Sequence, residues 1–308
     1  MRVFVTGASG WIGSAVVPEL IGAGHQVVGL ARSDSSAAAL DKVGAEVRRG
    51  TLDDLDVLRD AAAASDGVIH LAFKHDVAFG EGRFLDAANA DRRAVETFAD
   101  ALAGTDRPFV LASGLLGLAP GRLATERDDD DVAEGGEGPA ARQATARLTL
   151  SLASRGVRSS IVRLPPTVHG DGDKGFTAGL VGIARGKGLA GYVEDGDGDG
   201  AGRWPAVHVL DAANLFRLAL EKAPARSVLH AAADEGVPLR AVAEVIGRRL
   251  GLPVAPIAPA DAAEHFGWLA RMVGVDSRAS SALTRELLGW RPARPGLLDD
   301  LDEGHYFA

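Results

Sequence analysis

The sequence predicts an α/β fold, in which a doubly wound parallel sheet is joined by a smaller C-terminal α/β domain. Short apolar runs alternate with longer helical patterns through the first half of the chain, which is typical of βαβ units with right-handed crossovers. The apolar run at residues 68–72 is continuous instead of alternating, as expected for a strand that is covered on both faces.

The larger domain is predicted element by element from two local patterns. Short apolar runs bounded by turn residues predict strands, and apolar residues at helical spacing predict helices. The predicted strands are residues 3–5, 26–30, 45–47, 67–71, 108–112 and 157–164. The predicted helices are one from about residue 11 and those at 35–43, 52–63, 83–103 and 139–154.

The regular alternation ends after residue 164, where Pro165-Pro166 and two Gly/Asp-rich stretches interrupt it. We expect one further strand of the sheet near residues 206–209. The helices expected after residue 170 are 176–186, 211–222, 239–250, 260–273 and 279–288. The two expected domains are residues 1–169 plus about 205–226, and about 170–204 plus 227–308.

The composition limits the classes of protein to consider. The net charge is −9, which argues against a nucleic-acid partner because phosphate binding needs clustered Lys and Arg. The absence of cysteine excludes disulfides, thiolate metal sites and cysteine nucleophiles. The acidic run at residues 128–131 is typical of a solvated loop, and no spacing predicts a metal site.

No membrane partner is expected, because no run of about 18 apolar residues occurs. The first residues form a short apolar run that ends in glycine, without the longer apolar stretch and cleavage site of a signal peptide. We expect a cytoplasmic protein by default, and a homodimer stays an open alternative.

The first predicted strand leads directly into the loop Gly7-Ala8-Ser9-Gly10-Trp11-Ile12-Gly13, which opens the first predicted helix. Glycine lets the backbone turn tightly and approach a pyrophosphate, whose charge the free N–H groups of the helix start attract. A flexible turn is the alternative, but the strand before and the helix after favour a dinucleotide site. The loop residues expected to contact the cofactor are Gly7, Ser9, Gly10, Trp11, Ile12 and Gly13.

The end of the second strand selects between dinucleotides. An acidic residue there would bind a ribose 2′-hydroxyl, whereas an arginine accommodates a 2′-phosphate. The strand ends in Arg32 and Ser33, and Asp34 lies slightly late for the ribose. Arg32 can bind phosphate with two parallel hydrogen bonds and Ser33 can add another. We therefore expect NADP(H) in preference to NAD(H), with an exposed turn arginine as the alternative.

The glycine loop and five later segments resemble the extended short-chain dehydrogenase/reductase superfamily, whose loop reads TGxxGxxG. The later segments are Leu52-Asp53-Asp54, His70-Leu71-Ala72, Val110-Leu111-Ala112-Ser113-Gly114, Arg163-Leu164-Pro165-Pro166-Thr167-Val168-His169-Gly170 and Arg203-Trp204-Pro205-Ala206-Val207-His208-Val209-Leu210-Asp211-Ala212-Ala213. The likeness spans about residues 1–250. It implies a Rossmann fold whose larger domain binds the dinucleotide and whose smaller domain binds a small-molecule substrate.

The resemblance also implies roles for single residues. Leu52 and Asp53 would line the adenine, although Thr51 stands at the usual aspartate position. The turn after the fourth strand would lie beside the ribose and pyrophosphate. The residues of that turn are Leu71, Ala72 and Phe73. Pro165 would lie beside the nicotinamide, and Ser113 matches the catalytic serine.

One departure from the family bears on catalysis. Members of the family carry Tyr-x-x-x-Lys on the helix after the catalytic serine, where tyrosine supplies the proton and lysine lowers its pKa. In this sequence Arg142 takes the tyrosine position and Ala146 the lysine position. The two tyrosines of the chain, Tyr192 and Tyr306, lie far along it. The resemblance therefore identifies an atypical branch.

Four side chains remain candidates for chemistry: Ser113, Arg142, His169 and Tyr192. Ser113 could hydrogen-bond a carbonyl, or be simply a small residue that ends a strand. Arg142 stays charged and could stabilise an oxyanion or hold a carboxylate. His169 could act as general acid or cap a loop, and Tyr192 could close over the site. Structural or solvated roles are expected for His70, Lys74, His75 and His208.

Three functions follow as hypotheses. The first is an NADP(H)-dependent oxidoreductase that transfers hydride to or from a small carbonyl, imine or activated double bond. The second is a nucleotide-sugar epimerase or dehydratase, which ranks lower because it relies on the missing tyrosine and lysine. The third is a non-catalytic sensor that binds NADP(H) and reports on it to a partner protein.

Overall fold

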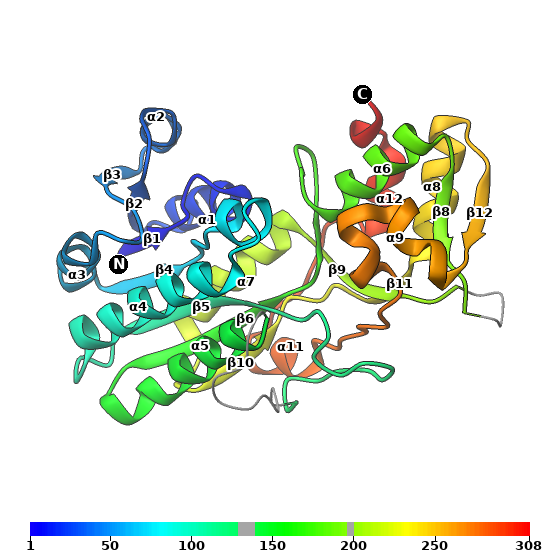
Figure 1. Cartoon of the computed structure of the whole chain (residues 1–308). Coiled ribbons are helices and arrows are strands. Elements are labelled where there is room, and N and C mark those ends of the chain that lie inside the picture. Colours follow the sequence, from blue (N-terminus) through cyan, green and yellow to red (C-terminus); the bar gives the residue numbers. More distant parts are fainter. Residues whose placement is uncertain (129–138, 196–199) are drawn as a thin grey trace.

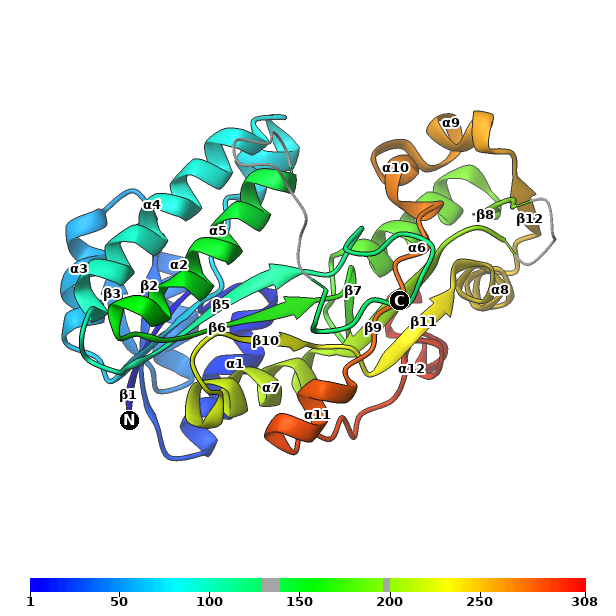
Figure 2. The same ribbon diagram turned by 90° about the horizontal axis from the view of Figure 1, so that it is seen from below.

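The computed structural model describes residues 1–128, 139–195 and 200–308. Its larger region contains a seven-stranded sheet with the order β10-β6-β5-β4-β1-β2-β3, and all neighbouring strands are parallel. A smaller region lies on the side toward which the arrows of β5 and β6 point (Figure 2). The predicted fold class, a doubly wound Rossmann sheet, is confirmed.

The elements of the larger region follow the predicted order closely. Its strands are β1 (Arg2–Thr6), β2 (Gln26–Ala31), β3 (Glu46–Arg49), β4 (Gly67–His70), β5 (Pro108–Gly114), β6 (Arg158–Leu164) and β10 (Ser227–His230). Its helices are α1 (Trp11–Gly22), α2 (Asp34–Lys42), α3 (Leu55–Ala63), α4 (Phe84–Leu102), α5 (Pro139–Ser151), α7 (Val209–Lys222) and α11 (Ala282–Leu288). Helices α1 and α7 cover one face of the sheet, and α4 and α5 cover the other (Figures 1 and 2).

Two hydrophobic cores lie on the two faces of this sheet. In β1, Val3 and Val5 belong to the core under α1 and α7, whereas Phe4 belongs to the core under α3 and α4. All three side chains are fully buried, so each contributes about 1.5–3 kcal/mol of hydrophobic stabilisation. Burial on both faces explains why the strands appear in the sequence as continuous apolar runs.

The smaller region contains two short sheets and a third core. Strands β7 (Thr167–His169), β9 (Arg203–His208) and β11 (Asp234–Pro238) form one sheet, and β8 (Ala190–Val193) and β12 (Val254–Ile257) form the other. Its helices are α6 (Phe176–Lys187), α8 (Leu239–Leu250), α9 (Ala262–Phe266), α10 (Ala270–Val273) and α12 (Leu297–Glu303). Trp204 is fully buried in the core of this region.

Two strands lie in different sheets from those expected. The strand predicted near residues 206–209 is β9, which pairs with β7 and β11 and not with the large sheet. The seventh strand of the large sheet is β10, from the segment assigned to the smaller domain, and it pairs with β6. Helix α7 packs on α1, so the chain that leaves α7 reaches the free edge of β6. An apolar run in the sequence predicts a strand, but it does not predict with which strand that strand will pair.

Two helices also differ from expectation. The helix predicted at residues 52–63 begins at Leu55, because the Asp54 carboxylate accepts hydrogen bonds from the backbone and hydroxyl of Thr51 and forms a turn. The helix predicted at residues 260–273 is broken into short pieces at Gly267, whose φ is +55°. Within the described part of the chain, no helix is long and apolar enough to cross a membrane.

Candidate functional site

The glycine loop forms a cradle at the start of α1. Gly7 has a φ of +66°, and a Cβ there would lie 2.8 Å from the Ala72 backbone nitrogen. A Cβ on Gly13 would lie 2.1 Å from the Gly7 carbonyl oxygen. Gly10 donates its N–H to that same carbonyl at 2.9 Å. The backbone of the loop is therefore packed tightly against the turn after β4 and against itself. The first N–H groups of α1 can bind a pyrophosphate.

A buried polar chain fixes the turn that lies beside this cradle. The Thr6 hydroxyl accepts a hydrogen bond from the Ala72 N–H at 3.3 Å and lies 2.5 Å from Nδ1 of His70. Nε2 of His70 lies 3.2 Å from the Asp91 carboxylate. These polar side chains are almost completely buried, and their mutual contacts offset the cost of removing them from water. His70 thus has the structural position expected of it.

Basic side chains gather where β2 and β3 end. Arg32, the expected 2′-phosphate ligand, is largely exposed and pairs with Asp76 at 3.0 Å. The Ser33 hydroxyl accepts from the Ser36 N–H at 3.2 Å and caps α2. Arg49 hydrogen-bonds the Ser33 carbonyl and the Asp34 carboxylate. No pattern in the sequence marks Arg49, because only the β2–β3 register, which pairs Ala31 with Arg49, places it there.

The residues expected around the adenine and the ribose lie on the loops after β3 and β4. Leu52 is buried in the core under α3. Asp53 is half-exposed, and its carboxylate pairs with Lys74 at 2.6 Å. Leu71 and Ala72 follow β4 directly and pack against the two cores of the sheet. The structure therefore brings these residues to the same edge of the sheet as the glycine loop.

Ser113 and Arg142 lie at one corner, at the end of β5. Ser113 is 8% exposed. Arg142 of α5 donates from Nη2 to the Ala112 carbonyl at 3.2 Å, and its guanidinium lies 4.1 Å from the centre of the Phe73 ring. Burial lowers the pKa of Arg142, and the Asp91 carboxylate opposes that shift. A guanidinium cation thus contacts the residue that precedes the matched serine.

His75 lies at the same corner and is exposed, as expected for a residue of a solvated loop. Its ring packs edge-on against Phe73, with 5.2 Å between the ring centres. Desolvation by the surrounding residues, followed by the charge of Arg142, lowers the pKa of His75. No motif marks this residue, which caps the start of the short π-helix η1 (Asp76–Gly80).

The loop between β6 and β7 approaches the glycine cradle. Pro165 is buried at its start. The Trp11 indole donates to the Val168 carbonyl at 2.8 Å, and a Cβ on Gly172 would lie 3.8 Å from the Trp11 ring. This hydrogen bond joins the first turn of α1 to β7. It therefore fixes the position of the glycine loop relative to the smaller region.

The structure does not bring His169 and Tyr192 to this corner. His169 is fully buried, its Nδ1 lies 2.8 Å from the Asp300 carboxylate, and its ring packs edge-on against His208. Tyr192 lies on β8, where its ring faces Arg240, and both views place β8 in the smaller region, away from β5 (Figures 1 and 2). Of the four candidates, Ser113 ends β5 and Arg142 hydrogen-bonds the residue before it.

The cradle, the buried turn and the parallel sheet define a dinucleotide-binding α/β protein. The family model for the NAD dependent epimerase/dehydratase family matches residues 3–232. The chain therefore belongs to that family and is an NAD(P)-dependent enzyme of the extended short-chain dehydrogenase/reductase type, as its motifs predicted.

Individual relatives cover the whole chain. An uncharacterised protein of Schizosaccharomyces pombe is 46% identical over 308 residues, with 100% of both chains covered. The 3-diazoavenalumate denitrifying reductase of a Streptomyces species is 30% identical over 315 residues, which cover 98% of this chain and 99% of the reductase. The solved UDP-glucose 4-epimerase of Thermotoga maritima superposes with a TM-score of 0.77 at 19% identity, covering 100% and 98% of the two chains, so it shows a shared fold.

Proposed function

We propose that the protein is an NADP(H)-dependent oxidoreductase that transfers hydride to or from a small carbonyl, imine or activated double bond. The observation that carries this proposal is the corner at the end of β5, where the guanidinium of Arg142 lies on the Phe73 ring and hydrogen-bonds the carbonyl of Ala112, the residue before Ser113. The name of the Streptomyces relative, a reductase of matching length, supports the same class of reaction.

The preference for NADP(H) rests on Arg32, Ser33 and Arg49. Two guanidinium groups and one hydroxyl converge on the end of β2, and guanidinium groups are suited to bidentate phosphate contacts. The ion pair of Arg32 with Asp76 is exposed on both sides, so it is weak. A 2′-phosphate can therefore replace Asp76 as the partner of Arg32 at little cost in free energy.

Each protein group at this corner would have a separate role in the reaction. The bound nicotinamide would supply or accept the hydride. Ser113 would hydrogen-bond the substrate oxygen or nitrogen, and Arg142 would stabilise the negative charge that develops on it. Arg142 cannot deliver a proton at ordinary pH.

We assign proton delivery to His75, because its ring and the guanidinium of Arg142 both pack on the ring of Phe73. His169 and Tyr192, the donors expected from the sequence, face other parts of the molecule. Since its pKa is lowered, a reaction that needs protonated His75 should slow as the pH rises through that lowered value.

The test is NADPH oxidation in the presence of aldehydes, ketones, imines and enones. Once a substrate is found, Ser113→Ala and Arg142→Ala should each lower turnover by about 10²–10³, because each removes one group that meets the developing charge. His75→Gln should remove the pH limb of turnover that reports this imidazole. Ser154→Ala and Arg92→Ala change exposed residues of the same types and should leave turnover unchanged.

The same screen separates the alternative functions. NADPH binding without turnover of any substrate would favour the non-catalytic sensor. Turnover of a nucleotide sugar without net oxidation of the dinucleotide would favour the epimerase, whose usual tyrosine is absent from α5. If both Ser113→Ala and Arg142→Ala keep wild-type turnover, the assignment of the catalytic site to this corner is wrong.

A further inference from the structure

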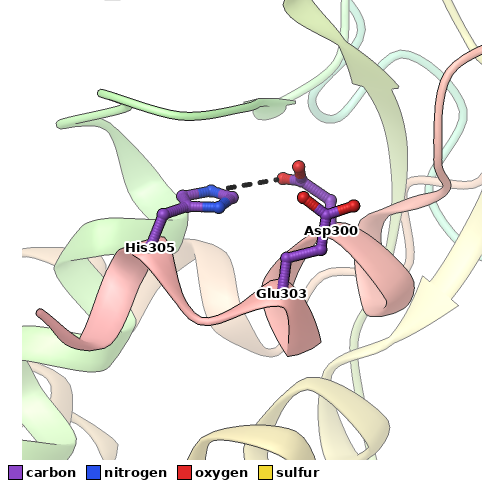
Figure 3. A group of neighbouring side chains, drawn as sticks. All are labelled: Asp300, Glu303 and His305. Carbon is purple, nitrogen blue, oxygen red and sulfur yellow. Dashed lines mark ion pairs between the residues drawn. The ribbon is translucent and has the colours of Figure 1, made fainter.

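Three metal-ligating side chains gather at the C-terminal end of the chain, outside the site described above. Asp300 and Glu303 are three residues apart on α12 and therefore share a face of that helix. Gly304 has a φ of +103° and ends the helix. The chain then turns so that the ring of His305 faces Asp300 (Figure 3). One ligand atom from each residue lies within 4.8 Å of the other two.

The separations within this group suit two ligands of one ion better than a hydrogen bond. Nε2 of His305 lies 3.7 Å from the Asp300 carboxylate, too long for a hydrogen bond. Two atoms bound tetrahedrally to zinc at about 2.0–2.2 Å lie roughly 3.4 Å apart. Nε2 of His305 also has no exposed surface and no hydrogen-bond partner among the described residues. Its lone pair is therefore available to a metal.

The surroundings of Asp300 also favour a bound cation. Its side chain is 3% exposed, and in the described part of the chain its ion pairs are all with imidazoles: His169 at 2.8 Å, His305 at 3.7 Å and His208 at 4.0 Å. A buried carboxylate is costly without a compensating cation. His169 is fully buried and fixes one carboxylate oxygen of Asp300, as hydrogen bonds commonly do for carboxylates that bind metals.

We propose that Asp300, Glu303 and His305 bind one divalent transition-metal ion. Zinc suits this set best, because one imidazole and two carboxylates leave a fourth tetrahedral position for water, whereas calcium prefers six to eight oxygens. The sequence analysis expected no metal site, because the ligands are ordinary residues until Gly304 turns the chain. Bound there, the ion fastens the C-terminal residues to β7 through His169.

The test uses the full-length protein after treatment with a chelator. Titration with Zn²⁺ in a calorimeter should show one site, and Co²⁺ should give a visible absorption band typical of nitrogen and oxygen ligands. Glu303→Gln changes an exposed side chain and should weaken Zn²⁺ binding at least tenfold while the protein stays folded. His305→Ala should weaken it further. At the same concentration, Zn²⁺ should raise the unfolding temperature of the wild type more than that of Glu303→Gln.

His265→Ala is the matched control, because His265 lies in the smaller region and its Nε2 also lacks a hydrogen-bond partner. It should bind Zn²⁺ as the wild type does. Two outcomes would overturn the proposal: a wild type that binds no Zn²⁺ at about 100 µM, or equal affinities in the wild type, Glu303→Gln and His305→Ala. Both measurements are independent of the proposed reductase activity.

Discussion

Arg32 and Arg142 illustrate how much the surroundings of a residue decide. Both are guanidinium groups at the edge of the proposed cofactor site, but Arg32 is largely exposed and paired with Asp76, whereas Arg142 lies on Phe73 with a lowered pKa. Arg32 can therefore move to meet a ligand. Arg142 is buried and hydrogen-bonded to the Ala112 carbonyl, so in the proposed role it would stabilise charge without reorganising.

Arg32→Ala is the residue change that tests the cofactor preference. It should weaken NADPH binding by about 1–3 kcal/mol, the range for hydrogen bonds to charged groups, and leave NADH binding nearly unchanged. Affinities are measured by titration of each dinucleotide. Arg48→Ala is the control, because Arg48 is an exposed arginine near the end of β3 that pairs with Asp60. Equal losses for NADPH and NADH would remove Arg32 from this role, and tighter NADH binding by the wild type would reverse the preference.

At the scale of elements, the β1–α1 unit shows which glycines shape the fold and which leave room for a ligand. A Cβ on Gly7 or Gly13 would collide with backbone, so changes there would disturb folding itself. A Cβ on Gly10 would meet a single atom, the Gly7 oxygen, at 3.2 Å, and the φ of Gly10 is −78°. Gly10 is therefore the position at which binding can be tested apart from folding.

Gly10→Val should abolish binding of NADPH and NADH alike, because the branched side chain would occupy the space in which the backbone meets the pyrophosphate. Binding is measured by titration, and the circular dichroism spectrum should match that of the wild type. Gly22→Ala is the control on the same helix, since a Cβ there meets no atom within 4 Å. Normal NADPH binding by folded Gly10→Val protein would place the pyrophosphate elsewhere.

The whole molecule is held together by contacts between segments far apart in the chain. His230 of β10 is an example: its backbone N–H donates to the Thr284 hydroxyl at 2.8 Å, and its Nδ1 lies 2.9 Å from the Ser280 carbonyl. Nε2 of His230 lies 3.4 Å from Arg163 of β6. Glu126 completes the cluster by accepting two hydrogen bonds from Thr284. The cluster joins the C-terminal segment to the large sheet.

This cluster predicts a dependence of stability on pH. Burial lowers the pKa of His230 from 6.5 to about 4, against the opposing attraction of Glu126. Between those two values the unfolded chain binds a proton that the folded protein excludes, so stability falls as the pH is lowered. The wild type should lose up to about 1.4 kcal/mol per pH unit more than His230→Gln between pH 6.5 and 4.5. Urea unfolding at several pH values measures this difference, and parallel profiles would contradict it.

The sequence by itself determined the features that depend on local backbone requirements. The parallel α/β fold, the glycine cradle and the position of Arg32 at the end of β2 were predictable, because each follows from neighbours along the chain. The tertiary structure decided the features that depend on register and packing. It placed β10 beside β6, brought Arg49 to Ser33 and Arg142 to Phe73, and buried His169 against Asp300. The partners of these residues are distant in sequence, and only the folded chain brings them within reach of one another.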